Sequence, residues 1–443
     1  MADQDDGHLD PNDVEDLLSE RLPDDRRRRA VGHLVGGCEP CRVQVQTRLV
    51  QARDEEAAYQ AAIDSALAKS VVHIRRELAD LAVGAPLWAG LREQPPARRM
   101  MMVRNSRRYG TAGVLAALLR DYHEELWRDP LEGLAVAELG VAIAERLDGG
   151  SCRRARLADL RGEALAIAAN AKRLASCHRE AADLLLAAEQ MRCAGSGDLL
   201  LEGRLLTYQG SLWQTLRFFA EAAQAFGQAE QAYRRAGELH LAARSLVARA
   251  EAIGYLHPVQ GVRLIRRAIP DIDGARDPHL ELAAHHCLAW YLNDAGQGWE
   301  ARAEVGRSAA LYQRFSGDAV ASLSRAWLQG RIDRSLHDLD QARRSYERAW
   351  AGFEELGMEI HLTMLSIDRA ELQAAAGELG NAAALLARIM RLVEGWGVGH
   401  ETLAALRLLR EAVLSRQCER AAFRQASLAV RRSWAKAGAG GPA

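Results

Sequence analysis

A repeat of about 40 residues runs through the C-terminal two thirds of the chain. A small residue marks each copy, and most copies carry a larger apolar residue such as Phe226 or Tyr346 four positions later. Another small residue, such as Gly210 or Gly330, stands 12 positions before the mark in most copies. The marks are Ala181, Ala222, Gly261, Ala301, Ala342, Ala382 and Ala422. A period of this length is typical of an array in which one supersecondary unit stacks on the next.

The composition indicates that these units are helical. Ala, Leu, Arg and Glu dominate, aromatic residues make up 5% of the chain, and only 11 of the 443 residues are proline. Helix propensity is therefore high almost throughout. The length exceeds one ordinary domain and suits an extended repeat array. We predict an all-α fold in which each copy is a pair of helices.

The order of small, large and small positions resembles the tetratricopeptide repeat (TPR) family. The resemblance covers about residues 152–436 and implies a solenoid of helix pairs that binds a protein or peptide in its groove. The period of about 40 residues exceeds the usual 34 or so, which predicts longer helices, and it also suits armadillo or HEAT pairs. We favour the TPR-like arrangement because the small and aromatic positions recur at the same offsets.

Helix-breaking residues suggest where the chain divides. Gly84-Ala85-Pro86 and Gln94-Pro95-Pro96 bracket a segment that we predict to be an interdomain linker. We divide the chain into an N-terminal helical domain (1–75), a helical connector that can include a degenerate first repeat (76–150), a solenoid of about seven repeats (151–438) and a disordered tail (439–443).

The repeat register also predicts which side chains face the groove. These are Arg204, His286, Trp290, Asn293, Trp327, Arg331 and Arg334. Tryptophan and arginine are enriched at the energetic centres of protein interfaces, which favours a binding role. The alternative is that the tryptophans are buried packing residues.

A second motif lies near the N-terminus, where His33 is followed by Cys38 and Cys41. Two thiolates and an imidazole are ligands that Zn²⁺ accepts in tetrahedral geometry, and a structural site needs a fourth ligand, for which His8 is the candidate. Gly36-Gly37 predicts the turn that brings Cys38 back toward His33. The alternative is that both cysteines are merely small apolar residues.

The spacing of these residues resembles the zinc-binding anti-sigma family of bacterial regulators over about residues 8–70. That resemblance implies a small zinc-stapled helical domain with His8, His33, Cys38 and Cys41 as ligands. It also implies a sigma factor as the partner of this domain. One residue more than usual separates His33 from Cys38, and the Gly36-Gly37 turn accommodates it.

Charge and motif content narrow the functional class. The formal net charge of −1 gives no global field for nucleic acid, and we expect neither direct nucleic-acid binding nor membrane insertion. Seven scattered cysteines suit a reducing cytoplasm. No phosphate-binding glycine loop or hydrolase motif occurs. We predict a cytoplasmic, non-enzymatic bacterial regulator or adaptor; the alternative is an interaction scaffold that has a purely structural zinc module and no sigma partner.

Overall fold

The computed structural model describes residues 8–19, 21–147, 154–395, 400–417 and 419–438. The predicted tail at 439–443, together with Cys152 and Cys418, lies outside these residues. The described residues contain helices and no strands, and they form the predicted all-α, TPR-like array of helix pairs. The chain forms two compact units, residues 1–82 and 83–443, and each is described by itself. The predicted division at 75/76 falls within a helix, and the domain assignment stays a prediction.

The first unit contains α1 (Pro11–Leu18), α2 (Asp24–Val35) and most of α3 (Glu39–Arg92). Asp10 caps α1 by accepting a hydrogen bond from the Asn12 N–H at 2.8 Å, and Pro11 occupies the first turn, where its missing N–H costs little. The buried apolar residues described in the first unit are Val14, Leu22, Ala30 and Cys41. A core this small normally needs a staple such as a metal ion.

The predicted helix break at Gly84-Ala85-Pro86 is wrong, because α3 continues through these residues to Arg92. Trp88 and Leu91 in its last turns are buried. A Cβ atom on Gly84 would overlap the backbone of Gly113, so glycine allows α3 to pack directly on the start of the next long helix. The second breaker does end α3, and α4 begins at Pro96.

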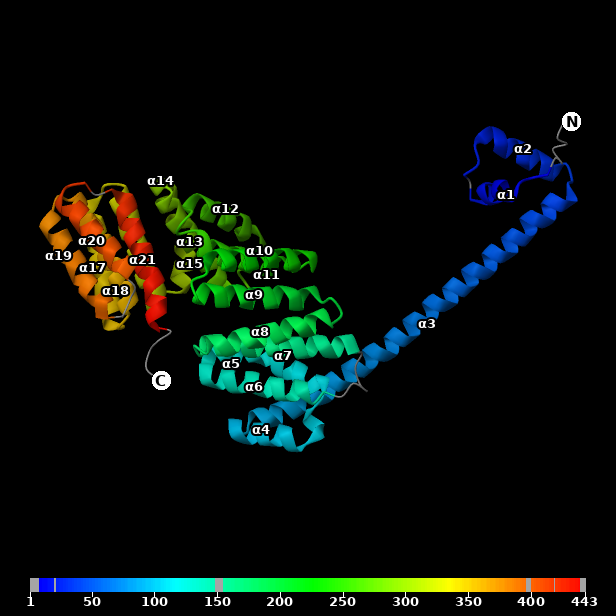
Figure 1. Ribbon diagram of the computed structural model, residues 1–443, viewed down its shortest axis with the longest axis horizontal. Helices are drawn as coiled ribbons and strands as arrows, with labels where there is room; N and C mark the ends of the chain where they lie inside the picture. The colour runs from blue at the N-terminus through cyan, green and yellow to red at the C-terminus, as the bar shows by residue number, and fades with distance from the viewer. Residues whose placement is uncertain (1–7, 20, 148–153, 396–399, 418, 439–443) are drawn as a thin grey trace. The chain divides into compact units, whose positions relative to one another are not determined.

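In the second unit, consecutive antiparallel helices pair and the pairs follow one another along the array (Figure 1). Shorter helices are α4 (Pro96–Asn105), α15 (Ala309–Arg314), and the 3-10 turns η1 (Arg107–Tyr109) and η2 (Ile269–Asp271). The pairs are α5 (Ala112–Arg128) with α6 (Pro130–Glu145), α7 (Arg154–Leu174) with α8 (His178–Cys193), α9 (Leu199–Thr215) with α10 (Phe219–Arg235), α11 (Leu239–Ile253) with α12 (Pro258–Ala268), α13 (Pro278–Asp294) with α14 (Gly298–Arg307), α16 (Ala319–Ser335) with α17 (Leu339–Glu355), α18 (Glu359–Ala375) with α19 (Leu379–Gly395), and α20 (His400–Leu414) with α21 (Arg420–Gly438).

Long helices account for the long period in part of the array. Both members of the pairs α9/α10 and α16/α17 have 17 residues, and short turns join them. The predicted small positions are where the helices approach most closely. A Cβ atom on Gly210 would lie 2.8 Å from the Phe226 ring, and a Cβ on Gly330 would overlap the ring of Tyr346. None of the described helices is long and apolar enough to span a bilayer.

Candidate metal centre and groove

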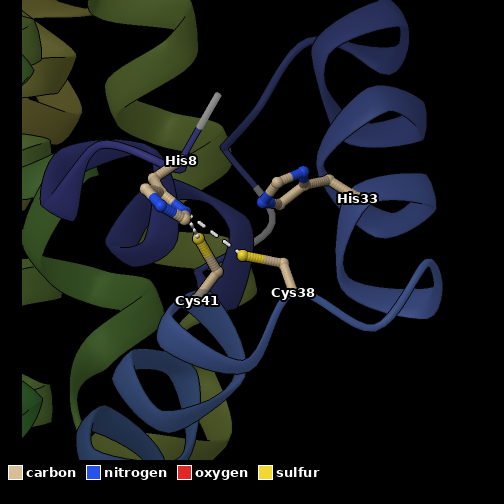
Figure 2. Close-up of side chains that lie close together, drawn as sticks. All are labelled: His8, His33, Cys38 and Cys41. Carbon is tan, nitrogen blue, oxygen red and sulfur yellow. Dashed lines mark hydrogen bonds between the residues drawn. The ribbon is translucent and has the colours of Figure 1, made fainter. Parts of the chain in front are cut away.

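Four predicted ligands come together in the first unit, where their side chains converge on one space (Figure 2). His8 immediately precedes α1, His33 lies in the last turn of α2, Cys38 lies in the turn before α3, and Cys41 lies in the first turn of α3. Their donor atoms all lie within 4.8 Å of one another, and this group could hold a metal ion.

Two of the distances between donor atoms are close to those around a tetrahedral ion. His8 Nδ1 lies 3.2 Å from Cys38 Sγ and 3.6 Å from Cys41 Sγ. With Zn–S bonds of about 2.3 Å and Zn–N bonds of about 2.0 Å, neighbouring donors lie about 3.3–3.8 Å apart. The ring centroids of His8 and His33 are 6.2 Å apart and their planes are nearly perpendicular, so the two imidazoles approach from different directions.

The surroundings of the four side chains also favour a ligand role. Nε2 of His33 is buried and has no hydrogen-bond partner among the described residues, which is costly unless an ion or other group binds it. The N–H of Leu9 donates to Cys41 Sγ at 3.2 Å, as backbone donors commonly do to a thiolate that binds a metal. Burial is the main cause that raises the pKa of the Cys41 thiol, so the thiol stays protonated unless a cation binds there.

Local backbone geometry holds this arrangement. Gly37 has a φ of 93°, in the left-handed region that glycine adopts without strain, and it turns the chain from α2 toward α3. The Arg42 guanidinium donates to the carbonyl oxygen of Leu34 at 2.8 Å and so ties the end of α2 to the start of α3. The Gly36-Gly37 turn therefore brings Cys38 back toward His33, as the sequence predicts.

The second candidate site is a groove on the face formed by the first helices of consecutive pairs. Two cavities of about 420 Å³ and about 270 Å³ lie there. His286, Trp290 and Trp327 line the larger cavity, whereas Trp290, Arg331 and Arg334 line the smaller one. The structure thus brings together five of the seven residues predicted to face the groove.

The other two predicted residues have different surroundings. Asn293 is fully buried, and its Oδ1 accepts a hydrogen bond from Ser335 Oγ at 2.6 Å. Arg204 on α9 forms an ion pair with Glu163 on α7 and lines neither cavity. Both residues link neighbouring first helices.

Ion pairs along the groove join residues about one repeat apart. Arg331 on α16 lies 2.7 Å from Asp294 on α13 and 2.7 Å from Asp368 on α18. Burial disfavours the charged guanidinium, but the two carboxylates outweigh it and raise the pKa of Arg331. Arg334 forms an ion pair with Glu371 in the same way. These arginines therefore support the array as well as lining the cavity.

Some residues that line the groove were not predicted from the sequence. Tyr255 follows α11, and Met364 lies on α18. Arg424 and Leu428 come from the last helix, α21, which packs against α18 and forms one wall of the smaller cavity. The register shows which face a helix presents within its own repeat. It carries no signal for a contact between residues 130 positions apart, such as the one from the Arg424 guanidinium to the Asp294 carbonyl.

Comparison with known proteins identifies the fold. No protein-family model matches the sequence, and no curated protein matches it. The resemblance to the zinc-binding anti-sigma family therefore stays a prediction. Solved structures do match.

Two of the similar structures are of Rap proteins, and a third is of an aspartyl phosphate phosphatase. A Rap protein complexed with Competence and Sporulation Factor has a TM-score of 0.53 and 15% identity, and the match covers 73% of this chain and 88% of that one. Apo RapI has a TM-score of 0.52 and 10% identity, covering 81% and 98%. Aspartyl phosphate phosphatase F from Bacillus subtilis has a TM-score of 0.50 and 14% identity, covering 88% and 94%. At these identities the likeness establishes the helix-pair solenoid fold and no more.

Proposed function

We propose that this chain is a non-enzymatic bacterial regulatory or adaptor protein that binds a protein or peptide segment in the groove of its solenoid. The observation that carries this proposal is the cluster of aromatic side chains lining the groove. Aromatic residues are enriched at interface hot spots, and Trp290 and Trp327 line the cavity although they are also core residues, 6% and 5% exposed. The solved neighbour complexed with Competence and Sporulation Factor supports a regulatory binding role.

Affinity capture from a bacterial lysate, followed by mass spectrometry, tests the groove. Ile360 is half-buried and lines the larger cavity, so Ile360→Gln should lose the captured protein. Val320→Gln is the matched control, because Val320 is exposed and lines neither groove cavity. Equal capture by both variants would show that the partner does not use the groove.

The N-terminal unit acts, in this proposal, as a zinc-stapled module with His8, His33, Cys38 and Cys41 as ligands. Four protein ligands leave no open coordination position, so the ion would be structural, and ions of this kind supply folding energy. Because thiolate ligands must stay reduced, the proposal places the protein in the cytoplasm. A sigma factor is the finer proposal for the partner of this unit, and a scaffold without a sigma partner is the alternative; co-purification separates the two.

Metal analysis by plasma emission tests the zinc assignment directly. We expect about one equivalent of zinc in the parent protein and its loss in the double variant Cys38→Ser/Cys41→Ser. Cys193→Ser is the control, since Cys193 is an exposed cysteine on α8 and outside the cluster. Less than about half an equivalent in the parent, or unchanged zinc in the double variant, would exclude this ligand set.

The name of one neighbour raises a different function, hydrolysis of an aspartyl phosphate. The non-enzymatic proposal predicts that the purified protein does not accelerate hydrolysis of acetyl phosphate, a small acyl phosphate. It also predicts that a phosphorylated receiver domain keeps its aspartyl phosphate for as long with the protein as without it. Faster loss in either assay would replace the adaptor proposal with a phosphatase.

A further inference from the structure

Shared lining residues place the cavities of the groove next to one another along one path. A third cavity, of about 620 Å³, lies beside α12 and α21. Tyr255 lines all three cavities, Trp290 and Met364 line both cavities described above, and Arg424 and Leu428 line the smallest and the third. A path of this extent suits an extended peptide better than one small metabolite, which a single pocket of several hundred cubic ångströms would enclose.

The cavity of about 420 Å³, called the aromatic cavity below, has rigid aromatic walls. The centroids of the Trp290 and Trp327 rings are 5.2 Å apart in an edge-to-face arrangement. Trp327 Nε1 donates to Asp368 at 2.6 Å, and the Arg331 guanidinium lies 4.4 Å from the Trp290 ring centroid, so both indoles are held in place. Burial lowers the pKa of His286 to about 4, so this side chain is neutral at pH 7, and Arg217 is the arginine that lines this cavity. A bulky apolar side chain fits such a surface.

The charges change along the path. In the smallest cavity, Asp294, Asp368 and Glu371 are all engaged by Arg331 or Arg334. The third cavity is lined by Arg263, Arg424 and His257, and no acidic residue is among the described residues that line it. Arg424 donates to a backbone carbonyl, which is an uncharged acceptor. This end of the groove therefore carries positive charge that the carboxylates of the groove do not neutralise.

We propose that the groove binds an extended peptide segment in which a bulky apolar side chain fills the aromatic cavity and Asp or Glu side chains meet Arg263 and Arg424. This inference rests on the proposed function, because it names the ligand chemistry of the same groove. The apolar anchor supplies most of the affinity, and the carboxylates supply orientation and selectivity.

Fluorescence anisotropy with the full chain and labelled octapeptides tests the inference. Every peptide has an amidated C-terminus, so that only side chains carry negative charge. One series places a single Asp at two to five residues on either side of a Phe, and matched series carry Ser or Lys at the same position. We expect the best Asp peptide to bind about tenfold more tightly than its Ser partner and to lose that advantage as salt screens the charges. Replacing Phe by Ala should weaken binding by a similar factor.

Variants assign these effects to the groove. Arg263→Gln and Arg424→Gln should each reduce the preference for Asp over Ser, whereas Arg391→Gln, on the exposed surface of α19, should leave it unchanged. Ile360→Gln should weaken all Phe peptides alike, and circular dichroism and the melting temperature confirm that each variant is folded. Equal binding of the Asp, Ser and Lys series, tighter binding of Lys, or no binding of any peptide would overturn the inference.

The capture experiment distinguishes failure of the acidic-peptide inference from failure of the proposed function. If a captured partner still depends on Ile360 but acidic peptides have no advantage, the groove binds a ligand of different chemistry and only the present inference is wrong. If capture is also independent of Ile360, the binding role of the groove itself is wrong.

Discussion

The ionisation of Glu251 on α11 should affect the stability of the protein. Burial raises the pKa of its carboxyl group to about 7. The unfolded value is about 4.3, so folding favours the protonated form. The resulting stability is fully present below the unfolded pKa and is lost as the pH rises through about 7.

Urea unfolding at pH 5 and pH 8 measures this effect. Glu251→Gln, which cannot ionise, should lose less unfolding free energy between these two pH values than the parent, by about 1–3 kcal/mol. Glu300→Gln is the control, because Glu300 is an exposed glutamate and its loss should leave the parent's pH dependence intact. The same slope in the parent and in Glu251→Gln would contradict the prediction.

A second residue-scale prediction concerns the close approach at Gly330. A Cβ atom there would overlap the Tyr346 ring, which is almost fully buried and cannot move aside easily. Gly330→Ala should therefore lower the unfolding free energy by about 1–3 kcal/mol. Gly306→Ala is the control, since nothing lies within 4 Å of its added Cβ, and it should stabilise the protein slightly. Denaturant titration of both variants checks the pair, and similar stabilities would refute this packing explanation.

At the scale of the helix, the ends of the first helices show how the repeats turn. His337 follows α16 with a φ of 65°, and Gly377 follows α18 with a φ of 80°. Left-handed geometry costs a residue with a Cβ about 1 kcal/mol relative to glycine. His337→Gly should thus raise the melting temperature, and Gly377→Ala should lower it. Calorimetry measures whether the melting temperatures of the two variants shift in opposite directions. Shifts in the same direction would show that the left-handed turn residues do not determine these changes.

The sequence predicts these helices well because the information is local and repeated. Small residues such as Gly210 and Gly330 recur where a neighbouring ring must fit, and a period of 40 residues leaves room for two long helices and their turns. The predicted helix break at 84–86, the first boundary of the expected linker, could not be judged in this way. Glycine and proline usually end a helix, and only the close packing of Gly84 on Gly113 shows why this one continues.

The same distinction between local and long-range information applies to the two candidate sites. The metal cluster could be assembled from the sequence because His33, Cys38 and Cys41 lie within nine residues and one turn connects them. His8 is farther away, and its position depends on how α1 and α2 fold back. In the groove, the repeat register identified Trp290 and Trp327. It could not identify Arg424, because long-range packing of the last helix decides which side chains complete the wall.

At the scale of the whole molecule, the two units differ in what stabilises them. The second unit has extended cores of buried side chains that run from one helix pair to the next. Among the described residues, the first unit has few buried apolar side chains, and in our proposal a metal ion supplies stability that this core does not. Removal of the metal should therefore unfold residues 8–45 and leave the solenoid folded, because each unit has its own core.

Hydrogen exchange read out by mass spectrometry distinguishes the two units within one sample. After chelation, amides in α1, α2 and the first turns of α3 should exchange faster, whereas those in α13, α16 and α18 should exchange at the parent rate. Cys38→Ser/Cys41→Ser should show the same pattern without chelator, and adding zinc back should restore protection only in the parent. Faster exchange in the solenoid would mean that the ion stabilises more than its own unit, and unchanged exchange around His8 and His33 would mean that this unit does not depend on a metal.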